Sequence, residues 1–197
     1  MPTGVAIRAA RERLFAAAER ILAREGPSGL TSRAVTVEAL VAKGVLHRHF
    51  TDFDAFLAEF VLDRVERMDA DAAALRERAG TGTVVDNLTE SITALFGSVA
   101  VSVVALITFR DGLRERLRET YPAGIPVLTD AVGVIAEYLD AERTLGRLAP
   151  EAEIDALAPT LIGASHLLFA DRTTGQPTAD AVRRTVATVI GDKVLSR

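Results

Sequence analysis

Hydrogen-bond donors and positive charges gather in one short segment near the N-terminus of the chain. Lys43 and Arg48 carry full positive charges, and His47 and His49 carry ring N–H groups. Such side chains donate hydrogen bonds to phosphate oxygens and to the acceptor atoms on base edges. The two histidines are two residues apart, about 200° around a helix, so they cannot hold one metal ion from the same face. The chemistry that this segment offers is the binding of an anionic polymer.

The charges are unevenly distributed along the 197-residue chain. Residues 1–50 contain eight Lys and Arg against four Glu, a net charge of +4, whereas the remaining residues contain 15 against 23, a net charge of −8. The total of −4 conceals this asymmetry. A small basic segment attached to an acidic body is typical of a module that binds an anion, although a basic segment also arises by chance.

Patterns typical of catalysis or metal binding are nearly absent from the sequence. There is no cysteine and there are three histidines, which excludes disulfides, zinc ribbons and thiol nucleophiles. Gly163-Ala164-Ser165-His166 resembles half of a nucleophile elbow but lacks the closing glycine and a preceding strand. No phosphate-binding loop and no Glu-x-x-His pair occurs. We therefore expect no catalytic residue, no metal site and no cofactor.

Apolar residues recur with helical spacing along almost the whole chain, and no segment alternates as a strand does. The predicted fold is therefore all-α. Glycine, proline and capping residues divide the pattern into nine helices. Their expected spans are about 11–26, 33–40, 42–50, 51–79, 83–96, 99–119, 127–145, 150–171 and from 178 onward.

Ser91 to Phe109 form an uncharged stretch of 19 residues, just long enough to cross a bilayer. Hydroxyl-bearing residues interrupt the stretch and arginines follow it directly, so we expect buried core helices and no membrane span. Charged residues begin close to the N-terminus, which lacks the apolar region of a signal peptide. This predicts a cytoplasmic protein.

Residues 31–57 have the layout of a helix-turn-helix, in which two short helices follow an arginine-bearing helix and precede a long one. The second short helix of such a motif enters the major groove, where small residues allow close approach and Lys43 reaches guanine acceptors. Taken singly, each donor fits a solvated or partly buried position in a helical hairpin better than a DNA contact. Taken together with the basic segment, the donors favour binding to DNA. The candidate DNA-binding residues are Thr31, Ser32, Arg33, Ala42, Lys43, Gly44, Val45, His47, Arg48 and His49.

The segment from Leu30 to Leu57 resembles the DNA-binding segment of TetR-type transcriptional regulators. The closest match is Gly44-Val45-Leu46-x-x-His49-Phe50, followed by an acidic capped helix. The helix from Arg11 to Gly26 fits the first helix of that family, and the remainder fits in length and helix order. The resemblance implies an N-terminal three-helix helix-turn-helix domain over residues 1–52, followed by a six-helix ligand-binding and dimerisation domain over residues 53–197.

Three residues depart from the family pattern. Leu40 stands in the turn where the family usually has glycine, which reaches positive φ at low cost. His47 replaces a tyrosine that contacts phosphate and remains a possible donor. Phe53 replaces a lysine at the start of the fourth helix and cannot bind phosphate. We therefore expect DNA affinity to depend more on the helix N-terminus and on the side chains of Arg33, Lys43, Arg48 and His49.

The resemblance further implies a homodimer, in which the last two helices of each subunit pack as a four-helix bundle. The apolar faces of these helices agree with this, while an intramolecular hairpin core is the alternative. The predicted interface residues are Leu161, Ile162, Ser165, Phe169, Val182, Val186 and Val189.

The resemblance also implies a pocket for a small-molecule effector, which the uncharged stretch suggests to be mostly apolar. The expected function is a repressor that binds a palindromic operator in double-stranded DNA and is released by the effector. The alternatives are a ligand-binding dimer that has lost specific DNA binding and a helical enzyme that uses the cavity. The candidate ligand-binding residues are Phe60, Arg64, Met68, Ile92, Phe96, Ser102, Phe109, Tyr138 and His166.

Overall fold

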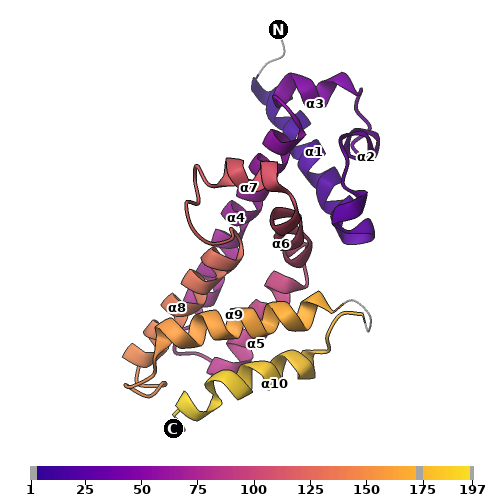
Figure 1. The fold of residues 1–197 in the computed structure, drawn as a ribbon. Helices are drawn as coiled ribbons and strands as arrows, with labels where there is room; N and C mark the ends of the chain where they lie inside the picture. The colour runs from indigo at the N-terminus through magenta and orange to yellow at the C-terminus, as the bar shows by residue number, and fades with distance from the viewer. Residues whose placement is uncertain (1–3, 172–174, 196–197) are drawn as a thin grey trace. The chain divides into compact units, whose positions relative to one another are not determined.

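The computed structural model describes residues 4–171 and 175–195, and in these residues the fold is all-α, as the periodicity predicts (Figure 1). The only β-type pairing in the described part is one bridge between Leu148 and Val194. The helices are α1 (Gly4–Glu25), η1 (Pro27–Gly29), α2 (Ser32–Glu38), α3 (Gly44–His49), α4 (Phe53–Glu77), α5 (Val84–Phe96), α6 (Ala100–Phe109), α7 (Asp111–Leu117), α8 (Leu128–Thr144), α9 (Ile154–Ala170), α10 (Ala179–Ile190) and η2 (Gly191–Lys193), where η marks a 3-10 helix.

Contacts between Cα atoms group the chain into two compact units. The first unit comprises Met1–Arg64 and Ser102–Pro126, and the second comprises Val65–Val101 and Val127–Arg197. Helix α4 contributes its first half to the first unit and its second half to the second unit. The domain boundary predicted after residue 52 lies between α3 and α4.

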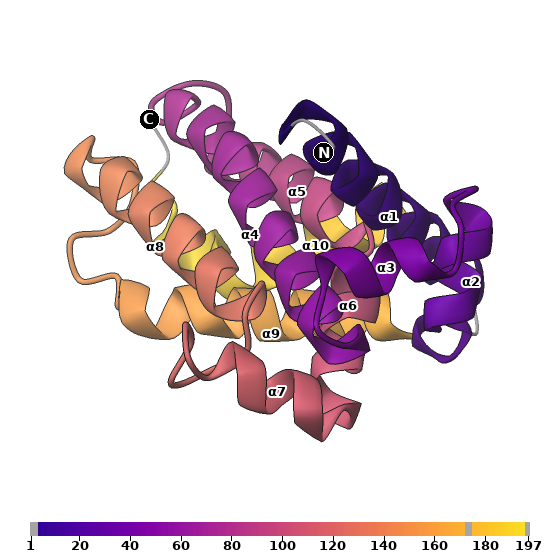
Figure 2. The same ribbon diagram turned by 90° about the horizontal axis from the view of Figure 1, so that it is seen from above.

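Aromatic side chains form the core of the first unit. Phe15 of α1, Phe50 at the end of α3, and Phe56 and Phe60 of α4 are buried, with neighbouring ring centroids 5.1 to 6.5 Å apart. The guanidinium of Arg11 lies 5.1 Å from the ring centroid of Phe50. Helices α2 and α3 both pack on α1, as Figures 1 and 2 show. The aromatic core therefore holds the helix-turn-helix against α1 and the start of α4.

The predicted continuous helix over residues 99–119 is wrong, because Arg110 divides it into α6 and α7. Arg110 has an extended backbone, with φ −125° and ψ 96°, and its carbonyl oxygen accepts the first hydrogen bond of α7. Asp111 places a carboxylate in the first turn of α7, where the helix dipole favours negative charge. The side chain of Arg110 pairs with Asp54 of α4. The apolar spacing continues through the break, so the sequence pattern does not reveal it.

Hydroxyl and carboxylate side chains cap several helices. Thr31, Thr83 and Thr178 each accept a hydrogen bond from the backbone N–H three residues later, which confirms the predicted starts of α2, α5 and α10. For α4 the cap is Asp52. Oδ1 of Asp52 accepts a hydrogen bond of 2.8 Å from the N–H three residues later.

In the second unit, α9 packs against both α8 and α10, and α10 also packs against α5. The inward faces of these helices are apolar, which gives this unit its own core. The buried apolar residues of this core include Leu88, Ile92, Ile135, Leu139, Leu161, Phe169, Val182, Val186 and Ile190.

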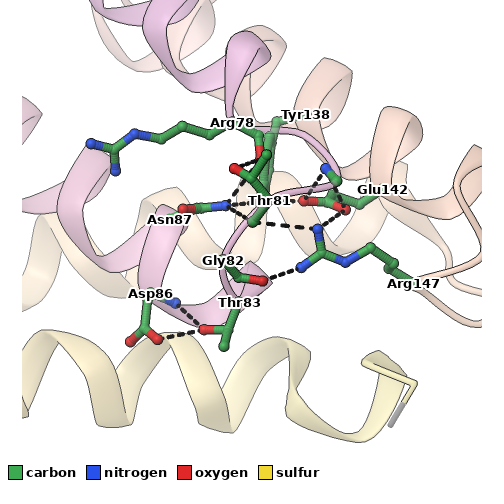
Figure 3. Close-up of polar contacts among 10 residues, drawn as sticks. Arg78, Thr81, Gly82, Thr83, Asp86, Asn87, Tyr138, Glu142 and Arg147 are labelled. Carbon is green, nitrogen blue, oxygen red and sulfur yellow. Dashed lines mark hydrogen bonds and ion pairs between the residues drawn. The ribbon is translucent and has the colours of Figure 1, made fainter. Parts of the chain in front are cut away.

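A buried polar network joins the α4–α5 loop, α5 and α8 in the second unit (Figure 3). The carboxylate of Glu142 is fully buried; it accepts a hydrogen bond of 2.6 Å from the Tyr138 hydroxyl and forms an ion pair of 3.3 Å with Arg147. Nδ2 of Asn87 donates to the Tyr138 oxygen at 3.0 Å and to the carbonyl oxygen of Thr81 at 2.9 Å. Burial, together with the hydrogen bond to Glu142, raises the pKa of Tyr138 well above its usual range. The buried carboxylate of Glu142 therefore has both hydrogen-bond and ion-pair partners.

Among the described residues, no single helix is both long enough and apolar enough to cross a bilayer. The pair α5 and α6, taken together across its bend, meets these criteria by length and composition.

Candidate nucleic-acid interface

The turn between α2 and α3 is built around Leu40. This residue has φ 54°, in the left-handed region that glycine adopts at low cost, and its side chain is 85% exposed. Its N–H donates to the carbonyl oxygen of Val37 at 3.0 Å. Arg13 of α1 donates to the carbonyl oxygens of Ala39 and Leu40. Leu40 therefore adopts the backbone geometry expected of glycine, and the turn is retained.

Most of the predicted DNA-binding side chains lie on the surface of this motif, while Leu46 and Phe50 face the core. Gly44, at the start of α3, has open space where a Cβ atom would be, so the approach to this end of the helix is unobstructed. The exposed candidates are Thr31, Arg33, Ala42, Lys43, Gly44, His47 and Arg48, and the half-buried ones are Ser32, Val45 and His49.

The cations of the first unit differ in whether they have ion-pair partners. Arg20 and Arg24 of α1 pair with Glu38 of α2 at 2.7 and 3.1 Å, and their hydrogen bonds lower the pKa of Glu38. These charges are satisfied within the chain. On the helix-turn-helix surface, by contrast, three cations have no ion-pair partner anywhere in residues 4–171 and 175–195. They are Arg33, Lys43 and Arg48.

Two arginines from the α6–α7 region hold the start of α4, which follows the predicted recognition helix α3. Arg116 pairs with Asp52, and Arg110 pairs with Asp54. The guanidinium of Arg110 also lies 5.2 Å from the ring centroid of Phe53. Sequence reasoning missed this role because the partners are 56 and 64 residues apart in the chain. The available signal in the sequence was the cluster of arginines in residues 110–118, but a cluster does not predict which residues the arginines contact.

Four predicted ligand-binding residues belong to the first unit. Phe60 lies in the aromatic core, and Ser102 is buried on α6. Arg64 pairs with Glu19 of α1 at 2.5 Å, so its charge is already neutralised. Phe109 is 89% exposed, which does not fit a residue that lines an enclosed pocket.

The other five predicted ligand-binding residues belong to the second unit. Met68 and Ile92 line a cavity of about 30 Å³. That volume admits a water molecule and is far below the roughly 300–1,000 Å³ of typical ligand pockets. Tyr138 lies in the buried polar network instead. The rings of Phe96 and His166 are 5.9 Å apart, and burial lowers the pKa of His166.

Most of the predicted dimer-interface residues face the core of the second unit, where a partner chain cannot reach them. Because α9 and α10 pack against other helices of the same unit, their main apolar stripes are already covered, as the alternative of an intramolecular core implies. On the opposite side of α9, Leu167 is 75% exposed and Gly163 has open space at its Cβ position. The buried residues are Leu161, Ile162, Ser165, Phe169, Val182 and Val186, and Val189 is half-buried.

In the part of the chain that the structure describes, an all-helical fold carries an N-terminal helix-turn-helix with cations that have no ion-pair partner, which is typical of a DNA-binding regulator. Residues 14–60 match the family described as bacterial regulatory proteins of the tetR family. This match confirms the resemblance inferred from residues 30–57. The chain therefore carries a TetR-type helix-turn-helix domain on the fold of TetR-family transcriptional regulators.

Solved structures share this fold at low sequence identity. A TetR-family transcriptional regulator from Agrobacterium tumefaciens has a TM-score of 0.73 at 14% identity, over 96% of this chain and 100% of that chain. For Escherichia coli NemR in its reduced form, the values are 0.72 and 16%, over 92% and 97%. A transcriptional regulator from Saccharomonospora viridis in complex with choline gives 0.70 and 19%, over 96% and 100%. No curated protein matches the sequence.

Proposed function

We propose that this protein is a ligand-responsive transcriptional repressor, which binds a palindromic operator as a homodimer and leaves it when a small molecule binds. The proposal is carried by three cations on the helix-turn-helix surface that have no ion-pair partner among the described residues. They are Arg33, Lys43 and Arg48. Cations that neutralise phosphates release condensed counterions, which makes binding favourable and dependent on salt. The TetR-type match at residues 14–60 supports the same role.

The residues around α3 make two kinds of contact with DNA, to base edges and to phosphate. Lys43 precedes the first turn of α3 and is exposed, as is Gly44, so this end of the helix reads base edges in the major groove. Arg48 is exposed in the last turn and contacts phosphate.

A palindromic operator has two equivalent half-sites about one helical turn apart, so it requires two reading heads. The uncovered faces of α9 and α10 provide the surface on which two subunits meet. On this surface Leu167 is exposed, Gly163 allows close helix approach, and Ala187 of α10 is small and exposed. Leu167→Glu is expected to shift the protein to monomers in light scattering, whereas Leu145→Glu, at an exposed leucine just after α8, leaves the mass unchanged.

The effector acts by a shift between two conformations of the dimer. A ligand changes DNA affinity only if it binds one conformation more tightly than the other. The apolar lining at Met68 and Ile92 supports a mostly apolar effector. The conformation that binds the effector has a larger cavity at this place.

The test is a fluorescence-polarisation titration of the full chain against DNA from upstream of its own coding region, repeated across salt concentrations. The proposal expects a preference for one sequence over scrambled DNA and a steep loss of affinity with salt. Weak binding that is equal for all sequences would instead indicate a ligand-binding dimer without an operator. Turnover of a bound small molecule would favour a helical enzyme.

Single substitutions separate the two kinds of contact. Lys43→Ala is expected to reduce discrimination between operator and scrambled DNA by about 1–3 kcal/mol. Arg48→Ala is expected to weaken binding to all sequences alike and to reduce the salt slope by about 1. Arg76→Ala is the control, because Arg76 is an exposed arginine in the second half of α4, outside both the helix-turn-helix and the proposed subunit surface. If neither Lys43→Ala nor Arg48→Ala changes binding, the role assigned to α3 is wrong.

A further inference from the structure

We infer that α7 and the loop that follows it form a second ligand site, which takes a small organic acid and acts on the start of α4. A cavity of about 210 Å³ lies between the end of α6, helix α7 and residues 121–126. All of its lining residues belong to the first unit, so it is distinct from the apolar cavity at Met68 and Ile92 in the second unit. Its volume suits a compact molecule.

The lining of this cavity combines positive charge with apolar walls. Arg114 and Arg118 are four residues apart and therefore lie on the same face of the helix. The apolar part of the lining includes Ile107, Leu117 and Ile125. A carboxylate satisfies the guanidinium groups, and a short hydrocarbon body contacts the apolar walls. The chemical class that fits is a monocarboxylic acid with a compact apolar body.

The two arginines are not equivalent. Arg114 pairs with Asp111, and its Nη1 donates to the carbonyl oxygen of Thr108 at 3.2 Å. These contacts fix its position at the cavity wall. Arg118 is exposed, and its side chain has no ion-pair partner among the residues that the structure describes. Arg118 therefore supplies the free charge that captures the acid, beside a second guanidinium that is already held in place.

Helix α7 also connects this cavity to the DNA-binding motif. Arg116, two residues from Arg114 and thus on another face of α7, pairs with Asp52, the residue that caps α4. At Gly112 a Cβ atom would lie 2.5 Å from Oδ2 of Asp54, so α7 approaches the first turn of α4 closely. A ligand that moves α7 therefore changes the contacts of the segment that follows α3. This regulatory step rests on the proposed DNA-binding function, whereas the acid site does not.

The site is tested by isothermal titration of the full-length protein with propionate, isobutyrate and benzoate. Benzamide is the neutral counterpart of benzoate, and inorganic phosphate represents a bare anion. We expect saturable binding of at least one of the acids, no binding of benzamide and weaker binding of phosphate. Binding of none of the acids, equal binding of benzamide, or equal or tighter binding of phosphate overturns the proposal.

Arg118→Gln removes the free charge and keeps most of the side-chain length, so we expect it to weaken acid binding by at least about tenfold. Arg184→Gln removes an exposed, unpaired arginine of α10 in the described chain and should leave the affinity unchanged. Equal affinity of wild type and Arg118→Gln contradicts the site. Because Arg118 is exposed, circular dichroism should show the same helix content in all three proteins.

The regulatory step has a separate readout. A saturating acid is expected to change the affinity of wild-type protein for its operator by about fivefold or more, and to change that of Arg118→Gln much less. If the protein binds the acid but no DNA, the proposed function fails and the acid site stands. If it binds both independently of one another, the action of α7 on the start of α4 is refuted.

Discussion

The guanidinium of Arg13 donates a hydrogen bond to the carbonyl oxygen of Leu40 at 3.3 Å, and one to that of Ala39 at 2.8 Å. Helix α1 thus supplies partners for carbonyl groups at the C-terminal end of α2. The same contacts fix Leu40 at φ 54°, a region that costs an L-residue roughly 1–2 kcal/mol. The turn of the helix-turn-helix is therefore maintained by a long-range contact where the TetR-type segment usually has glycine.

Leu40→Gly should stabilise the protein. Glycine removes the cost of the left-handed conformation and adds a smaller cost in backbone entropy, so we expect the free energy of unfolding to rise by about 0.5–1 kcal/mol. Little apolar burial is lost because the side chain is exposed. Urea denaturation provides the measurement, and Leu40→Ala, which keeps the positive φ, is the control expected to show no gain. A decrease in stability of Leu40→Gly would mean that the turn is not strained.

The ion pair between Arg110 and Asp54 should contribute measurably to stability. Both side chains are partly exposed, so a double-mutant cycle with Arg110→Gln and Asp54→Asn should give a coupling of about 0.5–1 kcal/mol, which decreases at high salt. The contact of Arg110 with Phe53 is lost in both variants that carry Arg110→Gln and therefore cancels in the cycle. The more exposed pair of Arg76 and Glu137 is the control and should couple more weakly. Equal coupling in the two pairs would contradict a special role for Arg110.

Local signals in the sequence were sufficient for much of the fold. Threonines that precede apolar repeats correctly predicted the starts of α2, α5 and α10, because a capping hydrogen bond involves residues only three positions apart. The order of the helices and the helix-turn-helix layout followed from the same short-range patterns. These features depend on neighbours in the chain, which a sequence displays directly.

Contacts between distant residues could not be predicted in this way. The break between α6 and α7 falls at Arg110, whose side chain pairs with the distant Asp54, and the apolar spacing on either side gives no sign of it. The same holds for α9, because an apolar stripe on a helix predicts that this face is buried but does not predict which helix or subunit buries it. Leu161 and Phe169 were assigned to a partner subunit and are covered by the chain's own helices, while Leu167 remains exposed. Candidate site residues chosen from such stripes can therefore be assigned to the core or to an interface only from the three-dimensional arrangement.

The buried carboxylate of Glu142 should be important for the stability of the second unit. Glu142→Ala removes the acceptor for the Tyr138 hydroxyl and the ion-pair partner of Arg147. The hydroxyl and the guanidinium are then left without a partner inside the protein. We expect a loss of about 3–5 kcal/mol in the free energy of unfolding. Glu137→Gln, which alters an exposed carboxylate of the same helix, should cost less than about 1 kcal/mol.

Chemical denaturation distinguishes these outcomes, and Glu142→Gln serves as an intermediate case. The amide keeps an oxygen that can accept from Tyr138 but removes the charge opposite Arg147. It should therefore cost less than Glu142→Ala and more than Glu137→Gln. If Glu142→Ala is no more disruptive than Glu137→Gln, the network contributes little.

The stability of the protein should decrease in mild acid partly because of His166. Burial lowers the pKa of His166 from the ordinary 6.5, and its Nδ1 atom is buried without a hydrogen-bond partner among the described residues. The unfolded chain therefore binds a proton at higher pH than the folded chain does. The stabilisation is complete well above pH 6.5 and is lost as the pH falls from 6.5 through the lower folded-state pKa.

Urea denaturation at about pH 7.5 and about pH 5.5 measures this contribution as the change in unfolding free energy between the two conditions. In His166→Gln that change should be smaller than in wild type, since the side chain no longer titrates. His47→Gln, which alters an exposed histidine, should keep the wild-type change. Carboxylates contribute nearly equally in all three proteins, so the comparison isolates the histidine. An identical pH dependence of wild type and His166→Gln would show that burial of this ring does not disfavour its charged form.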